Sequence, residues 1–97
     1  MAESMQFVGK FYFRSILLER AGDRVPQHRH DVPHPTLCGS GRANYYVDGA
    51  LRGTVCAGYA VEIEAGALHE FEALEDGTRL TCVFDAEDAM RLKEKGY

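Results

Sequence analysis

Residues 22–41 have the sequence GDRVPQHRHDVPHPTLCGSG, which carries three of the four histidines of the chain. Side chains alternate between the two faces of a β-strand, so His28 and His30 are expected to point to the same side. Prolines flank the third histidine, His34, and mark a bend that could turn it back toward this pair. The fourth, His69, lies far downstream, directly after a glycine-centred turn. The four imidazoles together predict one transition-metal site that exists only once the strands have paired.

Outward from this stretch, the sequence alternates short apolar segments with turns that contain glycine. Asp48-Gly49 is typical of a type I′ hairpin turn, because both residues tolerate a positive φ. The proline-rich stretch 24–35 cannot be a helix. Strands are expected over residues 6–20 (one or two strands), 37–47, 51–56, 59–63, 69–74 and 79–84. A repeat of about ten residues per strand predicts an antiparallel, all-β sandwich or barrel.

Only the C-terminal tail departs from this pattern. Asp85 is a good N-cap for a helix over about residues 86–95, with acidic residues in the first turn and lysines in the last. Ala89, Met90 and Leu92 would give this helix a short apolar face, directed to the barrel or to a second subunit.

Length and charge limit the remaining possibilities. A chain of 97 residues is expected to form a single domain, residues 1–97, because two domains would each lack a core. The net charge of −4, with no cluster of lysine or arginine, argues against nucleic acid or an anionic membrane as partner. No apolar stretch approaches the roughly 18 residues of a membrane span. The N-terminus lacks the pattern of a secretory signal, so a cytoplasmic location is expected.

The three cysteines, Cys38, Cys56 and Cys82, are far apart in the sequence. Each lies among apolar or small residues of an expected strand, and none forms a C-x-x-C pair. We therefore interpret them as reduced thiols packed as small hydrophobic residues, not as metal ligands or nucleophiles.

The simpler interpretation of the histidines is that each lies separately at the surface or in the core. His34 in particular could serve only the loop between its two flanking prolines. Composition alone does not decide between this interpretation and a metal site, so the framework of glycines around the histidines becomes important. Gly22 precedes His28 by six positions, and Gly41 follows the third histidine after six intervening residues. Downstream, Gly58 is followed after seven residues by Gly66, and His69 comes after two more intervening residues.

This framework resembles the cupin superfamily of small β-barrels. The first cupin motif is G-(x)5-H-x-H-(x)3,4-E-(x)6-G and corresponds to residues 22–41; the second is G-(x)5-P-x-G-(x)2-H-(x)3-N and corresponds to residues 58–73. Every glycine and histidine of both motifs agrees in spacing. Glu64 replaces the proline and Ala73 the final asparagine of the second motif, two positions that the family often relaxes. The resemblance implies a double-stranded β-helix, or jelly-roll, barrel.

The third departure concerns the site itself. His34 stands where the family usually has a glutamate ligand. Some family members carry four histidines at this spacing, so the resemblance implies that His28, His30, His34 and His69 are the metal ligands. A three-histidine site with His34 displaced is the alternative.

The ligand types restrict the metal. Nitrogen ligands argue against Mg²⁺ and Ca²⁺, leaving one divalent Mn, Fe, Ni, Cu or Zn ion per chain, with Mn or Fe slightly favoured. Four neutral imidazoles do not cancel the charge of the ion, so an anionic ligand or substrate is favoured. The resemblance implies two neighbouring coordination positions that stay open for water, oxygen or substrate. A closed structural zinc site is the alternative.

Three functions are compatible with these residues. The resemblance implies a metal-dependent enzyme acting on a small organic substrate, with oxygenase or oxidoreductase chemistry preferred over isomerase, epimerase or lyase chemistry. A non-catalytic barrel that binds or senses a metabolite or metal is the second possibility, and a barrel without a specific metal the third. The resemblance also implies a homodimer that uses an N-terminal strand, which would cover exposed strand edges.

Few supporting residues can be assigned from the sequence, and no catalytic acid or base stands out. Phe71 should share the inner side of its strand with His69 and form an apolar pocket wall. One of Tyr45 and Tyr46 faces inward. Four arginines could bind an anionic substrate, but each is better interpreted as a surface residue: Arg14, Arg29, Arg42 and Arg79.

Overall fold

Glycine-containing turns divide the chain into short strands, as the sequence predicts. A computed structural model describes residues 2–94, with backbone only for residues 93 and 94. Its elements in chain order are β1 (Ala2–Val8), β2 (Phe11–Leu18), β3 (Arg24–His28), β4 (His34–Ser40), β5 (Arg42–Val47), β6 (Ala50–Cys56), β7 (Ala60–Ile63), β8 (His69–Ala73), β9 (Thr78–Asp85) and α1 (Ala86–Glu94).

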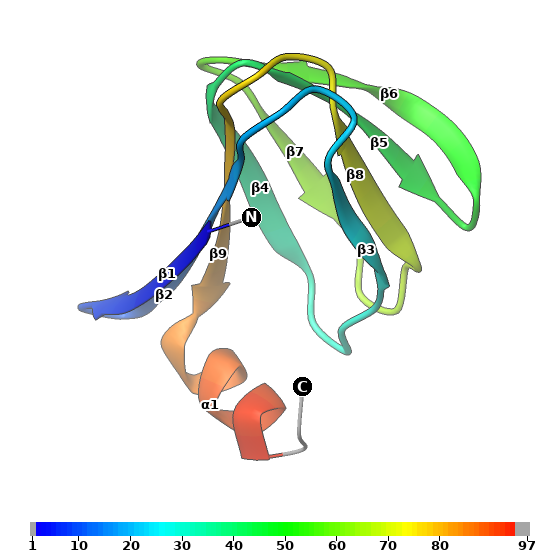
Figure 1. Cartoon of the computed structure of the whole chain (residues 1–97). Coiled ribbons are helices and arrows are strands. Elements are labelled where there is room, and N and C mark those ends of the chain that lie inside the picture. Colours follow the sequence, from blue (N-terminus) through cyan, green and yellow to red (C-terminus); the bar gives the residue numbers. More distant parts are fainter. Residues whose placement is uncertain (1, 95–97) are drawn as a thin grey trace.

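The strands form two antiparallel sheets that face each other (Figure 1). One sheet has the order β1-β2-β9-β4-β7 and the other the order β3-β8-β5-β6. Strands distant in sequence are neighbours: β2 pairs with β9 and β3 pairs with β8. The all-β, antiparallel architecture with a short C-terminal helix is therefore confirmed.

The core lies between the sheets and consists of side chains at alternate strand positions. Phe71 at the centre of β8 is 2% exposed, as predicted for an inward residue. Tyr45 packs against this core, whereas Tyr46 lies on the outer face and donates a hydrogen bond to Glu72.

The cysteines are packing residues, as interpreted from the sequence. Cys38 and Cys82 are buried free thiols, and Cys56 is half-buried. Burial raises the pKa of the Cys38 and Cys82 thiols, so both stay protonated at neutral pH.

Two expectations about the strands are wrong. β3 ends at His28, with a register shift between Val25 and His28, so His30 lies in the loop that follows and not on the same strand. The expected strand over residues 37–47 begins earlier, at His34, and divides into β4 and β5 in different sheets. Gly41 makes this division possible, because its φ of +72° turns the chain between the sheets.

The helix begins as predicted. The Asp85 carboxylate accepts hydrogen bonds from the backbone N–H groups of Glu87 and Asp88, at 2.9 and 3.1 Å. Ala89 and Leu92 are buried beside β9, whereas Met90 is 55% exposed, so only part of the predicted apolar face is covered. Residue 95, the predicted end of the helix, lies outside the described residues.

Replacing Gly41 with alanine is expected to destabilise the fold. A Cβ at this position would lie 2.9 Å from the Cα of Thr78, and the positive φ adds strain. The expected loss is about 2 kcal/mol of unfolding free energy, measured by urea denaturation. Gly58→Ala is the matched control, because Gly58 also has a positive φ but has nothing within 4 Å. Equal losses in the two variants would contradict the role of the close contact with Thr78.

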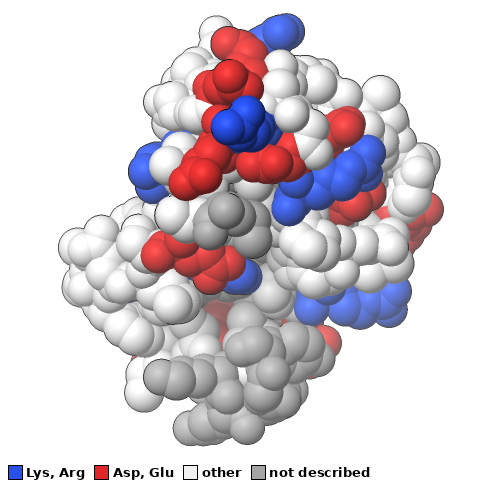
Figure 2. All heavy atoms as spheres, in the orientation of Figure 1, with Lys and Arg blue, Asp and Glu red and all other residues white. Residues whose placement is uncertain are grey.

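Charges of both signs are interspersed on the face shown in Figure 2. Arg24 forms ion pairs with Glu70 and Glu72 at 3.2 and 3.1 Å, and Arg42 pairs with Glu75. Among the described residues, α1 is too short to cross a membrane, and no other helix qualifies.

Candidate metal centre

The four histidines converge at one end of the barrel, between the two sheets. His28 ends β3 and pairs directly with His69, the first residue of β8, in the four-stranded sheet. His34 opens β4 in the five-stranded sheet. His30 lies in the β3–β4 loop, which is fastened to the β7–β8 turn by a hydrogen bond from Gly66 N to His30 O of 2.7 Å. In Figure 1 these two connections lie side by side near α1.

The imidazole rings are in mutual contact. Ring centroids are 4.1 Å apart for His28 and His69, 4.8 Å for His28 and His30, and 5.6 Å for His30 and His69. One ring nitrogen from each of these three lies within 4.8 Å of the others. His34 is outside this tight group, although its ring centroid is 5.5 Å from His30 and 5.4 Å from His69. The structure therefore brings three of the predicted ligands together and places the fourth beside them.

Backbone carbonyls orient three of the rings. Nδ1–H of His28 donates to Pro26 O at 2.8 Å, that of His69 to Ala67 O at 2.9 Å, and that of His34 to Pro35 O at 3.3 Å. A carbonyl oxygen only accepts, so in the neutral ring the proton is on Nδ1 and the lone pair is on Nε2. Metal-binding histidines are typically held in this way.

The surroundings also keep the rings neutral. Burial lowers the pKa of all four imidazoles, to about 3 for His30 and to about 4 for His34. The neighbouring imidazoles and the Arg14 guanidinium lower the pKa of His30 further. Neutral imidazole is the form that binds a metal ion.

These shifts predict that metal-free protein is labile to acid. The unfolded chain takes up a proton at His34 near pH 6.5, whereas the folded chain takes it up near pH 4. Between these values the unfolded state binds more protons, so the stability falls as the pH falls. The contribution of His34 from pH 7 to pH 4 is about 3 kcal/mol. Urea denaturation of chelator-treated protein at several pH values measures it.

His34→Gln is the matching variant for the acid experiment, because glutamine does not titrate. The variant should lose stability less steeply than wild type between pH 6.5 and pH 4. Parallel stability–pH curves for the two proteins would contradict the lowered pKa of His34.

The residues present fit a transition-metal ion. Nε2 of His34 and Nε2 of His69 are buried and have no hydrogen-bond partner among the described residues. Buried polar atoms without a partner are rare, and a metal ion would satisfy both. Nitrogens bound to one ion at about 2.1 Å are at most about 4.2 Å apart, so the rings need to approach only slightly. The available ligands are imidazole nitrogens, which suit Fe, Ni, Cu and Zn better than Mn.

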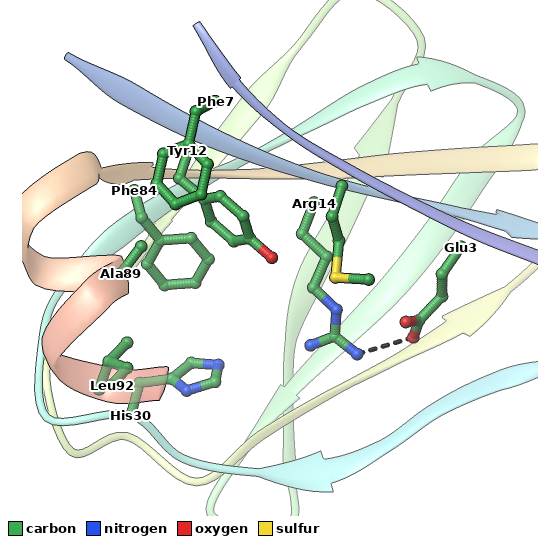
Figure 3. Close-up of a pocket in the computed structure, with 9 residues that line it drawn as sticks. Glu3, Phe7, Tyr12, Arg14, His30, Phe84, Ala89 and Leu92 are labelled. Atoms are coloured by element: carbon green, nitrogen blue, oxygen red, sulfur yellow. Dashed lines mark hydrogen bonds and ion pairs between the residues drawn. The ribbon is translucent and has the colours of Figure 1, made fainter. Parts of the chain in front are cut away.

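A cavity of about 380 Å³ opens beside His30 (Figure 3). Phe84 of β9 forms part of its wall; its ring centroid is 5.4 Å from His30 and 4.5 Å from His34. Arg14 of β2 lines the cavity and is 30% exposed, so it is less exposed than the interpretation as a surface residue predicts. Arg29, Arg42 and Arg79 are exposed, as expected.

Sequence reasoning missed most of the cavity wall. Phe84, Tyr12 and the inward residues of β1 were not assigned to the site. Alternation would have placed Tyr12 on the inner side of β2 together with Ile16. It could not show that β2 pairs with β9, which brings Tyr12 to Phe84, with ring centroids 6.1 Å apart.

Comparison with solved structures identifies the architecture. KdgF from a Halomonas species matches with a TM-score of 0.73 and 16% identity, covering 86% of this chain and 76% of that one. An RmlC-like cupin family protein with a double-stranded β-helix fold from Methanocaldococcus jannaschii matches with a TM-score of 0.72 and 11% identity, covering 94% and 86%. The chain has the cupin fold.

A cupin 2 domain-containing protein from Halorhodospira halophila gives a TM-score of 0.72 and 18% identity, covering 95% of this chain and 75% of that one. No protein-family model matches the sequence, and no curated protein matches it. At these identities the likeness establishes the cupin fold, and function has to be argued from the site.

The cupin fold explains the spacing of the motif glycines. The first motif runs through β3 and β4, and the second covers β7 and β8. The four motif glycines all have a positive φ: Gly22, Gly41, Gly58 and Gly66. The spacing of glycines and histidines in this chain thus corresponds to turns that bring the histidine-bearing strands together.

Proposed function

We propose that this cupin-fold chain binds one divalent transition-metal ion through His28, His30, His34 and His69, and that it is a metal-dependent enzyme acting on a small organic substrate. The observation that carries the proposal is the cluster of four imidazoles, two of them buried and two half-buried, beside a cavity large enough for a small molecule. The Nε2 atoms of the buried His34 and His69 have no partner among the described residues. When bound, the ion would supply Lewis-acid or redox chemistry at the end of this cavity.

The chain's own residues would hold and isolate the substrate. The cavity wall is mainly apolar, and Phe84 packs against His30 and His34, which limits the contact of these two imidazoles with water. Arg14 supplies a positive charge on the cavity wall. Both features favour a compact organic molecule that carries a negative charge.

We propose oxygenase-type oxidoreductase chemistry as the reaction class. Isomerase and lyase reactions need a positioned acid or base. The side chains that line the cavity and could move a proton are Glu3, Tyr12 and His30, and Glu3 is bound to Arg14 at 2.7 Å. Glu3 is therefore engaged and His30 is a proposed metal ligand, which leaves Tyr12 as the remaining one of these three that could move a proton. We therefore propose oxidation over proton transfer as the preferred chemistry.

Oxygen uptake tests this proposal. Chelator-treated protein is reloaded separately with Mn, Fe, Ni, Cu and Zn and mixed with a panel of small acids and diketones. Oxygen consumption with a redox-active metal, absent with Zn and in His30→Ala, is the expected result. Turnover without oxygen uptake would instead indicate isomerase or lyase chemistry. Tight ligand binding without turnover would indicate a non-catalytic binding or sensing barrel and would contradict the enzyme proposal.

We also propose that the chain is a cytoplasmic homodimer. The support is β1, an edge strand whose seven residues are all exposed, and the apolar side chains of Val8 and Phe11 at its turn, which are 50% and 53% exposed. An uncovered edge with apolar neighbours is a template for association.

Light scattering tests the dimer. Phe11→Lys is expected to convert the dimer to a monomer, because it places a charge in the proposed contact. Tyr59→Lys is the matched control, since Tyr59 is 69% exposed outside this region. A monomeric mass for wild type would contradict the dimer.

A further inference from the structure

The cavity beside His30 exists because the two sheets differ in extent. Inward-facing residues alternate along β1, β2 and β9, and their register places Met5 opposite Arg14, and Arg14 opposite Cys82. β1 and β2 form the far edge of the five-stranded sheet, and the four-stranded sheet has no corresponding strands among the described residues. The inner side of this edge is therefore open, and α1 contributes Ala89 and Leu92 to its wall.

Aromatic rings form one wall of the cavity. The Phe7 and Tyr12 ring centroids are 4.8 Å apart, and those of Tyr12 and Phe84 are 6.1 Å apart. Met5 and Leu92 add further apolar surface. The cavity volume of about 380 Å³ is near the lower end of the range for ligand pockets, roughly 300–1,000 Å³. The cavity thus suits a compact apolar group such as a single ring.

An ion pair lies across the cavity from these rings (Figure 3). Nη2 of Arg14 donates to the Glu3 carboxylate at 2.7 Å, and both side chains are only about one-third exposed, 30% and 31%. Nη1 of Arg14 has no hydrogen-bond partner within the described part of the chain. A guanidinium has a planar fork of donors that matches a carboxylate, and Glu3 uses only one arm of it, so a ligand carboxylate that takes both arms would displace Glu3.

Arg14 also lies near two of the histidines, because it lines this cavity together with His30 and a neighbouring one together with His28 and His30. Its charge lowers the pKa of His28, His30 and His34. A negative group bound to Arg14 would therefore be near the imidazole cluster, and the attached apolar body would lie between Arg14 and Phe84.

We infer that the cavity binds a small carboxylic acid with a compact aromatic or branched apolar body, whose carboxylate is held by Arg14 and whose body packs against Phe7, Tyr12 and Phe84. Glu3 provides the competing carboxylate: in the free protein it occupies the Arg14 fork that the ligand carboxylate takes. The inference names a substrate class for the proposed function. It rests on that function only in placing the bound acid next to a metal ion. Binding itself requires no metal.

Fluorine NMR of 4-fluorobenzoate with chelator-treated protein tests the inference. The acid should bind, and 4-fluorobenzyl alcohol, which has the same ring and no charge, should bind at least about tenfold more weakly, because a charge-assisted hydrogen bond is lost. Arg14→Gln should weaken benzoate binding by about tenfold to a hundredfold and leave the alcohol unaffected. Arg14→Lys, which keeps the charge without the fork, should recover part of the affinity.

The Glu3→Gln variant tests whether Glu3 competes with the ligand carboxylate for Arg14 or only holds the Arg14 side chain in place. If Glu3 competes with the ligand for Arg14, this variant should bind 4-fluorobenzoate more tightly than wild type. Arg79→Gln is the matched control for loss of charge, because Arg79 lies exposed on the outer face of the same sheet and donates to Ser15. Its affinity for the acid should be unchanged. Circular dichroism verifies that each variant is folded.

The outcomes separate this inference from the proposed function. Equal binding of the acid and the alcohol, or an unchanged affinity in Arg14→Gln, would overturn the inference even if the protein binds a metal. Arg14-dependent binding by a protein that binds no metal would support the inference and remove the proposed enzyme function.

Discussion

Replacing His69 with glutamine is expected to lower the affinity for a divalent transition metal by at least about a hundredfold, because loss of an outer hydrogen-bond partner alone typically costs 10- to 100-fold. His69 is 1% exposed, pairs with His28 across the sheet, and has an Nε2 without a partner among the described residues. Its removal would take away a ligand held by both strand pairing and a backbone hydrogen bond. The chain has only four histidines, so no further one is available to replace it.

Elemental analysis and chelator competition measure this effect. Wild type purified without chelator should carry about one ion per chain, and His69→Gln should carry little. Cys56→Ser is the control for adventitious binding, since Cys56 is a half-buried free thiol. Substoichiometric metal that is the same in wild type and His69→Gln would contradict the metal site.

His34→Gln separates the four-ligand from the three-ligand site. His34 lies outside the tight group of three nitrogens, but its buried Nε2 has no partner among the described residues. If His34 is a ligand, its replacement should weaken binding at least about tenfold. An unchanged affinity would favour a site made by His28, His30 and His69 alone.

Replacing Phe71 with alanine is expected to remove about 3–5 kcal/mol of the unfolding free energy, the usual loss for a phenylalanine in a packed core. Phe71 is 2% exposed and lies at the centre of β8, with its ring 6.2 Å from Tyr45 and 6.3 Å from His69. The cavity left by the ring could not be filled without moving both sheets. A loss of this size is a large part of the stability of a small domain.

Urea denaturation of metal-free protein tests this prediction without involving the site chemistry. Phe71→Leu is the matched variant, because it keeps most of the apolar volume, and it should lose less than about 1.5 kcal/mol. A loss below about 1 kcal/mol in Phe71→Ala would show that Phe71 is not the centre of the core.

The sequence predicted the hairpin turn and the helix cap well because both depend on local chemistry. Asp48 and Gly49 both have a positive φ, as the hairpin signal required. Asp85 caps the helix through its own carboxylate. His28 and His69, on separate strands, are brought together by direct pairing of β3 with β8.

The cavity was harder to predict because it depends on which strands are neighbours. Phe84 reaches His34 only because β9 lies next to β4 in the five-stranded sheet. Alternation along β2 places Arg14 on the inner face. It does not reveal that, among the described residues, the opposite sheet has no strand there, so that Arg14 lies in an open cavity and not in the core. His30 lies next to His28 as predicted, but strand alternation is not the reason. The loop that holds His30 is bound to the β7–β8 turn by the hydrogen bond from Gly66, and this directs the side chain to the cluster.

The distribution of the histidines over both sheets determines when the proposed metal site could form during synthesis. His28, His30 and His34 emerge from the ribosome together, but His69 follows only after β4 to β7 have been made. A nascent chain that ends before β8 cannot assemble the site, whatever metal is present. An ion bound at the proposed site would therefore bind late in folding, so it would slow unfolding and would not speed folding.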